Sequence, residues 1–284
     1  MGLPLGGFPS KEMLPSIPSL GDGANLVIDG ASALADRLRI PHSRLYDEWR
    51  STRDPETWPE PPRGEGRPAM LIPGFLAGDP SLAPMAKWLK RGEWKLVKSG
   101  INWNVDCTQA TVEAVEARLE TLVRNTGQRA VIVGQSRGGA MGKVIAVRRP
   151  ELVDTLVTLG SPLNDQFDIH PRVWFGIGVI SGLGELGVPG FLSRDCATGD
   201  CCRETRIAYG RPFPRDVRFI SFYSRDDNIV RYQACLHSAA EQIEVASSHL
   251  GMGLDSEVWS HLSEMLATRP DRVDSVDRGE LKAA

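Results

Sequence analysis

This sequence of 284 residues contains no apolar run that approaches the roughly 18 to 20 residues needed to cross a membrane. Segment 1–23 lacks both the basic n-region and the apolar h-region of a secretory signal. The sequence also has no block rich in lysine and arginine, and its formal net charge is -3, so nucleic acid is not an expected partner. We therefore expect a cytoplasmic protein without a membrane segment, with secretion as the alternative.

Cysteine is also scarce: the chain has five, and three of them crowd into the stretch DCATGDCC. A disulfide from Cys196 to Cys201 or Cys202 would require an oxidising compartment, and without an export signal we expect free thiols. Zinc is less favoured, because no C-x-x-C pair or nearby histidine completes a site. The histidines form no H-x-H or H-E-x-x-H pattern, so neither a metal nor another cofactor is expected.

The composition is that of a globular enzyme, with 41% hydrophobic and 24% charged residues, which is enough to bury one large core. Residues 1–68 contain a Pro/Gly/Ser-rich arm and short helical patterns, and we expect them to pack on that core. Residues 69–268 hold the regular patterns and are expected to form one α/β domain. Residues 269–284 are mostly charged or small, and are expected to form a flexible tail.

Short apolar runs alternate with helical patterns along the central part of the chain. In the longest helical pattern, Val112, Val115, Leu119 and Leu122 recur at spacings of three and four. Such alternation predicts a mostly parallel sheet with helices on both faces. The expected strands are 69–73, 94–98, 130–134, 156–160, 217–223 and 243–247, and the expected helices between them are 81–92, 107–127 and 138–150.

A stretch rich in glycine follows the strand expected at 130–134. The sequence GQSRGG places Ser136 between Gly134 and Gly138, directly before a helical pattern. A sharp strand-to-helix turn strains its central residue, and its neighbours two positions away must lack side chains. The pattern therefore predicts a nucleophile elbow that exposes the Ser136 hydroxyl at the carboxyl edge of the sheet. A tight connection that contains serine by chance is the alternative.

A serine hydroxyl needs a base to take its proton, and the base needs an acid to orient it. The stretch SRDDNIV follows the fifth expected strand and carries Asp226 and Asp227, and ASSHLGM follows the sixth and carries His249. Both loops leave the same edge of the sheet as Ser136, in the order Ser, Asp, His. His261 instead falls within an apolar helical pattern and is expected to be structural.

Taken together, LIPGF, GQSRGG, YSRDDNIV and SSHLGM resemble the α/β-hydrolase superfamily, and within it the lipase and esterase branch, over residues 69–267. The resemblance implies the α/β-hydrolase fold and a catalytic triad with Ser136 as nucleophile and His249 as base. In such enzymes an acid followed two residues later by Ile-Val is common, which favours Asp227 as the acid. Asp226 remains the alternative.

The resemblance also implies an oxyanion hole. One donor is the backbone N–H of Arg137, which follows the nucleophile, and the other is the backbone N–H of Phe75 in LIPGFLAG. Many lipases have His-Gly where this chain has Pro73-Gly74, and many have His or Tyr where it has Gln135. These departures leave the chemistry intact but make the subfamily uncertain.

The interval 161–216 interrupts the alternation of strands and helices after the strand that follows the nucleophile helix. It contains the apolar, glycine-rich stretch VWFGIGVISGLGELGVPGFL, which suits a cap or lid over the site. Trp174 and Phe175 in this stretch, together with Leu76 and Gln135, are predicted to bind substrate. The alternative is that the apolar segments of the cap only bury one another.

The sequence therefore predicts an esterase or lipase that cleaves carboxylic esters of lipophilic substrates through an acyl-enzyme. Its expected partner is a small-molecule or lipid ester, and the sequence does not indicate an oligomeric state. An acyltransferase would use the same three residues. A catalytically silent module on the same fold would use the pocket only to bind a hydrophobic ligand.

Overall fold

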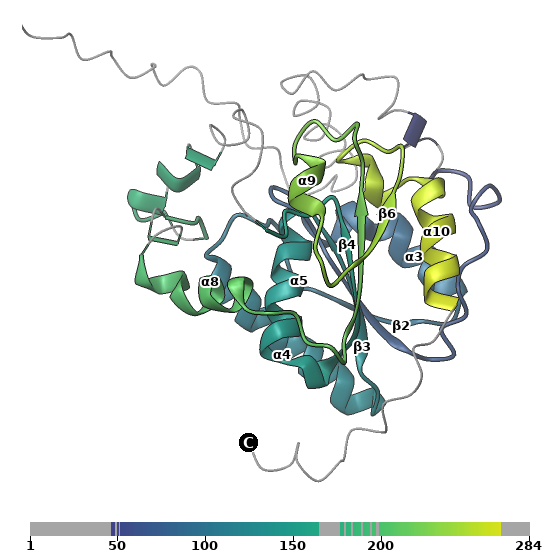
Figure 1. Ribbon diagram of the computed structural model, residues 1–284, viewed down its shortest axis with the longest axis horizontal. Coiled ribbons are helices and arrows are strands. Elements are labelled where there is room, and N and C mark those ends of the chain that lie inside the picture. Colours follow the sequence, from purple (N-terminus) through teal and green to yellow (C-terminus); the bar gives the residue numbers. More distant parts are fainter. Residues whose placement is uncertain are drawn as a thin grey trace, which may run out of the picture.

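The computed structural model describes residues 47–267 except for 49, 51, 165–176, 179, 183, 189, 194 and 197–198. Its centre is a six-stranded sheet in the order β2-β1-β3-β4-β5-β6, and every neighbouring pair is parallel (Figure 1). The mostly parallel sheet predicted from the sequence is therefore confirmed. The strands are β1 (Pro68–Ile72), β2 (Lys95–Lys98), β3 (Ala130–Gln135), β4 (Val153–Leu159), β5 (Arg218–Tyr223) and β6 (Glu241–Glu244).

The last strand differs from the prediction of a buried strand at 243–247. β6 comprises Glu241–Glu244, and three of its four residues are exposed. It pairs on one side only, with β5, and so forms an edge of the sheet. Edge strands carry charged side chains more readily than central ones, which is why the apolar pattern misplaced this strand.

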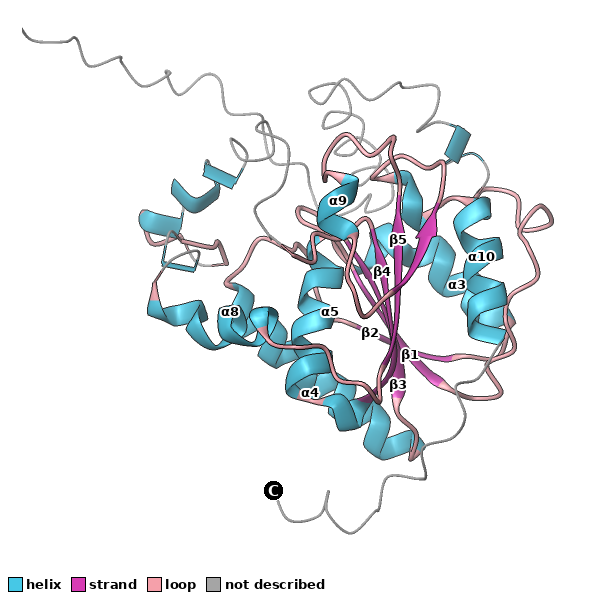
Figure 2. Cartoon of the chain, viewed as in Figure 1, coloured by secondary structure: helices cyan, strands magenta, loops and turns pink. Residues whose placement is uncertain are grey.

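Helices cover both faces of the sheet (Figures 1 and 2). α4, α5 and α8 lie on one side, and α3 and α10 lie on the other (Figure 1). The apolar face predicted for the longest helix is buried as expected. The α-helices are α3 (Ala83–Arg91), α4 (Thr108–Thr126), α5 (Arg137–Arg148), α8 (Arg203–Gly210), α9 (Tyr232–Cys235) and α10 (Ser256–Ala267), and the 3-10 helices are η2 (Asp79–Leu82), η3 (Pro150–Leu152), η4 (Asp200–Cys202) and η5 (Gly251–Gly253).

Side chains of each central strand alternate between two separate cores. Met70 and Ile72 of β1 belong to the core beneath α4 and α5, whereas Ala69 and Leu71 belong to the core beneath α3 and α10. Because both faces are covered, β1 is buried along its whole length. This explains why the central strands appear in the sequence as continuous apolar runs rather than as alternating ones.

The register of the sheet brings several loops to one edge. Gln135, the last residue of β3, lies beside Leu159 of β4, and Leu159 lies beside Phe222 of β5. Three chain segments therefore leave the sheet together at the carboxyl ends of β3, β4 and β5. In open α/β sheets this edge is where ligands bind.

The described part of the 161–216 interval packs against the loop before α4. Val105, Ile180 and Leu192 form a small buried apolar cluster, and the N–H of Leu192 donates to the carbonyl of Val105 at 2.7 Å. Trp174 and Phe175 lie outside the described residues, as do segments 1–46 and 268–284. None of the helices in the described ranges has the length and apolar character that a membrane crossing requires.

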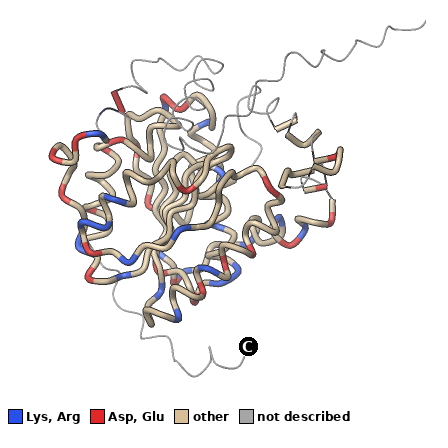
Figure 3. Tube along the Cα trace, turned by 180° about the vertical axis from the view of Figure 1, so that it is seen from behind, with Lys and Arg blue, Asp and Glu red and all other residues tan. Residues whose placement is uncertain are grey.

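Charged residues of both signs are interspersed over the described chain when it is seen from behind (Figure 3). Arg129 pairs with Asp216 at 3.1 Å, and Arg218 pairs with Glu241 at 2.7 Å. This mixing agrees with the small net charge of the sequence.

Candidate active site

Ser136 lies in the turn between β3 and α5. Its φ of 52° and ψ of −122° belong to a region that residues other than glycine rarely adopt. A Cβ atom at Gly134 would lie 2.5 Å from the Cα of Gly139, and one at Gly138 would lie 2.2 Å from the carbonyl oxygen of Ile72. The turn therefore closes only with glycine at both flanking positions, which holds the half-buried serine at the edge of the sheet.

Asp227 and His249 form a buried pair at the same edge. His249 Nδ1 lies 2.6 Å from Asp227 Oδ2, and the two side chains are 3% and 1% exposed. The other oxygen of Asp227 accepts the backbone N–H groups of Ile229 at 2.8 Å and Val230 at 2.9 Å. Asp226 is exposed. The structure therefore places Asp227, and not Asp226, against the histidine.

Gly160, directly after β4, leaves the space that this pair occupies. Its φ is +55°, and a Cβ atom there would lie 3.1 Å from Asp227 Oδ2 and 3.2 Å from His249 Nδ1. The preceding residue, Leu159, accepts the backbone N–H of Ser136 at 2.8 Å. The end of β4 thus lies between the serine and the Asp–His pair. The sequence marked Gly160 only as the end of a strand.

The Ser136 hydroxyl forms no hydrogen bond with any described residue. Catalytic hydrogen bonds are often long without substrate and tighten when substrate binds. Because Asp227 engages Nδ1 of His249, Nε2 is the ring nitrogen left to accept a proton. His261 lies on α10, with its Nδ1 4.0 Å from a carboxylate oxygen of Glu264.

A buried carboxylate that the sequence analysis missed holds the histidine loop. Glu48 accepts the backbone N–H of Ser248 at 2.8 Å and also accepts the hydroxyl groups of Ser247 and Ser248. A Cβ atom at Gly251 would collide with this carboxylate. Glu48 is separated from the loop by about two hundred residues, and it lies in the segment expected only to pack on the core. No local pattern marks such a contact.

Gln135, predicted to bind substrate, contacts the histidine loop instead. Its side chain is buried, and Nε2 donates to the carbonyl of His249 at 3.2 Å and to that of Leu250 at 3.3 Å. The residue directly before Ser136 therefore binds the backbone of the candidate base. This explains how two loops from β3 and β6, which are not neighbours in the sheet, are joined.

The loop after β1 runs next to the serine. A Cβ atom at Gly74 would lie 3.3 Å from the Cβ of Ser136 and 4.0 Å from its Oγ. The following residue, Phe75, has a backbone N–H that donates to no described residue. Arg137 is the first residue of α5, so its backbone N–H lacks an acceptor within the helix. Both predicted oxyanion donors thus flank Ser136.

Arg137 and Asn104 fix the relative positions of these two loops. The guanidinium of Arg137 donates to the carbonyl of Asn104 at 2.8 Å and lies 5.9 Å from the ring centre of Phe75. The buried amide of Asn104 donates to the carbonyl of Pro73 at 2.8 Å. Burial lowers the pKa of Arg137 to about 10, so the side chain stays charged at neutral pH. Asn104 is a second residue that no sequence motif indicated.

Apolar side chains gather beside the loop that follows β1. Leu76, with a φ of 62°, and Phe75 are partly buried against the cluster of Val105, Ile180 and Leu192. Leu76 thus belongs to this apolar group, and its contact with substrate stays a prediction. The predictions for Trp174 and Phe175 fall outside the described residues.

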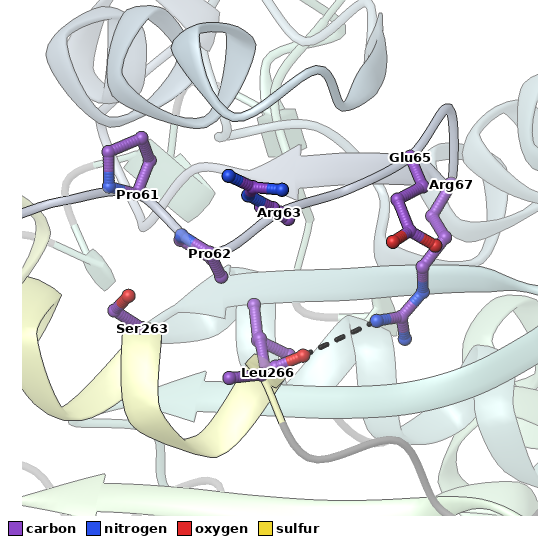
Figure 4. Close-up of a pocket in the computed structure, with 8 residues that line it drawn as sticks. Pro61, Pro62, Arg63, Glu65, Arg67, Ser263 and Leu266 are labelled. Atoms are coloured by element: carbon purple, nitrogen blue, oxygen red, sulfur yellow. Dashed lines mark hydrogen bonds between the residues drawn. The ribbon is translucent and has the colours of Figure 1, made fainter.

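A pocket of about 450 Å³ lies at the other end of the strands (Figure 4). Arg67 lines it, donating to the carbonyl of Leu266 at 3.4 Å and pairing with Asp154 at 3.1 Å. Arg67 precedes the amino end of β1, whereas Ser136 follows the carboxyl end of β3. This pocket is therefore separate from the candidate active site.

No protein-family model matches this sequence, and no curated protein matches it. Solved structures do match it. The mature form of a Bacillus licheniformis lipase gives a TM-score of 0.54 at 13% identity and covers 74% of this chain and 95% of the lipase. A Paleococcus ferrophilus monoacylglycerol lipase gives 0.50 at 13% identity, covering 74% and 96%. Aspergillus fumigatus lipase B gives 0.52 at 13% identity, covering 76% and 56%.

At such low identity these likenesses establish how the chain folds, and the residues of the site have to support any activity. The chain itself forms an all-parallel sheet with helices on both faces. The protein therefore has the α/β-hydrolase fold.

Proposed function

We propose that this protein is a serine hydrolase that cleaves carboxylic esters of lipophilic substrates without a cofactor. The observation that carries the proposal is the buried 2.6 Å contact between His249 Nδ1 and Asp227 Oδ2, at the sheet edge where the strained, half-buried Ser136 lies. A histidine oriented by a buried aspartate, next to a serine, is the arrangement that activates a hydroxyl group as a nucleophile.

In this mechanism Ser136 Oγ attacks the ester carbonyl while Nε2 of His249 takes the hydroxyl proton. Asp227 holds the Nδ1–H tautomer and stabilises the positive imidazolium that forms. The imidazolium then gives its proton to the leaving alkoxide, and an acyl-enzyme remains. Water attacks the acyl group with His249 again as the base, which releases the acid and restores the serine.

The backbone N–H groups of Phe75 and Arg137 stabilise the negative oxygen of the tetrahedral intermediate. Support comes from the position of both residues beside Ser136 and from the absence of another acceptor for the Phe75 N–H among the described residues. Each such donor is typically worth a factor of about 10² to 10³ in kcat. The side-chain contacts of Asn104 and Arg137 hold the two donor loops together.

Gln135 and Glu48 serve as positioning residues for His249. Gln135 holds the carbonyl groups of His249 and Leu250, and Glu48 holds the backbone and hydroxyl of Ser248. Neither is proposed to touch the substrate. Where many lipases have His or Tyr, Gln135 of this chain is thus assigned the role of positioning the histidine loop.

We assign the lipophilic part of the substrate to the apolar side chains beside the loop after β1, which carries Phe75. Leu76 and Phe75 pack with Ile180 and Leu192 on the side where the 161–216 interval approaches the core. Trp174 and Phe175 of the same interval stay predicted members of this acyl site. The solved structures of similar fold that are described as lipases agree with this class of substrate.

The test is hydrolysis of p-nitrophenyl esters from acetate to palmitate by the wild-type protein and by Ser136→Ala. We expect turnover by the wild type, loss of all but a small residual activity in the variant, and an optimum at an intermediate or long acyl chain. A maximum rate on the acetate ester would contradict the assignment of a lipophilic substrate, but it would still support a serine hydrolase.

Labelling by a fluorophosphonate separates the enzyme from a silent binding module, because only an activated serine reacts. We expect the wild type to be labelled and Ser136→Ala and His249→Ala to stay unlabelled. An unlabelled wild-type protein that hydrolyses none of the esters would overturn the proposal. Added alcohols that compete with water for the acyl-enzyme would reveal an acyltransferase by its ester products.

A further inference from the structure

Four cysteines from two distant parts of the chain converge next to the candidate active site. The Sγ atoms of Cys107, Cys196, Cys201 and Cys202 all lie within 4.8 Å of one another. Cys202 Sγ lies 3.6 Å from the Sγ of Cys107 and 3.6 Å from that of Cys201. Four sulfurs that bind zinc tetrahedrally at about 2.3 Å stand about 3.8 Å apart. The group therefore has the dimensions of a zinc shell.

We propose that these four cysteines bind one structural zinc ion as thiolates. Sulfurs joined in a disulfide stand about 2.05 Å apart, and two separate bridges would not require all four sulfurs to converge on one point. A tetrahedral set of four thiolates favours zinc and leaves no open position for water, so the ion would stabilise structure rather than perform chemistry.

Groups with positive or partial positive charge lie beside the cluster. Cys107 occupies the N-cap position of α4 and Cys202 that of α8, and helix N-termini carry partial positive charge. The backbone of Gln109, in the first turn of α4, forms a hydrogen bond to the sulfur of Cys202. The guanidinium of Arg137 interacts electrostatically with three of the four cysteines. These groups offset the double negative charge of a zinc ion with four thiolates.

The fold adds Cys107 as a fourth ligand to the three cysteines of DCATGDCC. Cys196, Cys201 and Cys202 are close in the sequence, whereas Cys107 is separated from Cys202 by 95 positions. The side-chain hydroxyl of Thr205 also donates to the side chain of Gln109, so α8 is held against α4 by a second contact. Zinc was disfavoured from the sequence because no C-x-x-C pair or nearby histidine completes a site, and the fold brings in Cys107 as the fourth ligand instead.

The ion would link the segment between residue 190 and α8 to the N-terminus of α4 through Cys107. In the described residues, this segment touches the loop before α4 through a small apolar cluster and the hydrogen bond from Leu192 to Val105. The same loop supplies the carbonyl groups of Asn104 and Asp106 that hold the Arg137 guanidinium. Zinc at this point would therefore stabilise both the segment and the neighbourhood of the nucleophile.

Metal analysis of the protein purified without a polyhistidine tag and under reducing conditions tests the proposal. We expect about one zinc ion per chain in the wild type, and loss of most of it in Cys107→Ser and Cys202→Ser. Cys235→Ser is the matched control, because Cys235 is buried elsewhere and lies outside the cluster. It should keep its zinc.

If Cys107→Ser and Cys202→Ser fail to fold, measurements on the wild type alone still test the proposal. X-ray absorption should give four sulfur neighbours at about 2.3 Å from zinc, and replacement by cobalt should give thiolate-to-cobalt charge-transfer bands. A mixed sulfur and oxygen shell, iron in place of zinc, or no metal bound to reduced protein would overturn the proposal. An intact mass showing two disulfides and no metal would overturn it as well.

The zinc site does not rest on the proposed hydrolase activity. Ser136→Ala should contain as much zinc as the wild type, so a protein without esterase activity can still confirm the site, and an active esterase can still lack it. We also expect chelation of the zinc to lower the melting temperature, since binding to the folded state alone stabilises it. Access for the chelator is provided by Cys201, which is exposed.

Discussion

At the scale of single residues, Asp227 is held by contacts to both of its carboxylate oxygens. One carboxylate oxygen faces His249 Nδ1, and the other accepts two backbone N–H groups from Ile229 and Val230. The turn that follows β5 thus fixes the carboxylate before any substrate is present. Its neighbour Asp226 is exposed, and its backbone N–H donates to the hydroxyl of Ser224 at 3.1 Å.

Asp227→Asn should lower kcat for ester hydrolysis by about 10⁴, because an amide does not enforce the tautomer that leaves Nε2 free to accept a proton. Asp226→Asn is the matched control and should stay near the wild-type rate. The check is kcat and KM on the best p-nitrophenyl ester. Equal losses in the two variants would contradict the assignment of the acid.

Lys143 is a buried cation that the mechanism does not use. It lies on α5, with its ammonium donating to the carbonyl of Leu163 at 2.7 Å and 4.5 Å from the ring centre of Tyr209. Burial lowers its pKa from 10.5 to about 8. Between these two values the unfolded chain binds more protons at this lysine than the folded chain does. The contribution of Lys143 to stability therefore rises with pH through this window.

Relative to Lys143→Met, the wild type should gain on the order of 1 to 2 kcal/mol in free energy of unfolding between pH 8 and 10. Below pH 8 the folded lysine is charged, so the full cost of burying its ammonium group is present. The difference in free energy of unfolding between the two proteins should therefore become constant there. Urea denaturation at several pH values measures both curves. Parallel curves from pH 7 to 10 would show that the lysine titrates normally in the folded protein.

At the scale of elements, the strand-to-helix turn at Ser136 depends on close packing against β1. Gly138 sits in the first turn of α5, and a Cβ atom there would lie 2.2 Å from the carbonyl oxygen of Ile72 and 2.6 Å from that of Pro73. Both neighbours are backbone atoms and cannot rotate away. Helix α5 can therefore approach β1 only where glycine stands.

Gly138→Ala should destabilise the protein by about 1 to 3 kcal/mol, because the helix must move away from β1. It should also lower kcat, since Pro73 leads directly into the loop that carries Phe75. Gly210→Ala is the control, because a Cβ atom there meets nothing within 4 Å. That change should alter stability by less than about 0.5 kcal/mol. Chemical denaturation and ester hydrolysis of both variants measure the two effects.

At the scale of the whole molecule, one contact joins a residue ahead of the sheet to a loop near its end. Glu48 holds Ser247 and Ser248, the two residues before His249, through hydrogen bonds that are buried. Gln135, at the end of β3, holds the same loop by donating to the carbonyl groups of His249 and Leu250. The candidate base is thereby positioned by segments far apart in the sequence.

Glu48→Ala should lower kcat by about 10² while changing KM much less, because misplacing a catalytic group by about 1 Å costs roughly that factor. Glu48→Gln keeps an oxygen acceptor and should recover a large part of the rate. Steady-state kinetics well below the melting temperature of each variant gives the comparison. A lower melting temperature with an unchanged kcat would mean that Glu48 only stabilises the fold.

Much of the fold was predictable because parallel strands buried on both faces are continuous apolar runs, and amphipathic helices show their period locally. The elbow glycines and the loops carrying Asp227 and His249 were predictable for the same reason: each is tied to the end of a strand. The bounds of the exposed edge strand β6 were predicted wrongly because its residues lack that apolar signal. Trp174 and Phe175 lie outside the described residues, so their roles stay predictions.

The sequence by itself determined the central strands, the long helices and the candidate nucleophile and base, and it limited the acid to Asp226 or Asp227, because these signals lie within a few residues of one another. Only the tertiary structure decided that Asp227 rather than Asp226 faces His249, and that Glu48 and Gln135 hold the histidine loop. It alone brought Cys107 to the three cysteines near residue 200. These contacts join residues separated by 22 to 200 positions, and no local pattern encodes the packing that closes such distances.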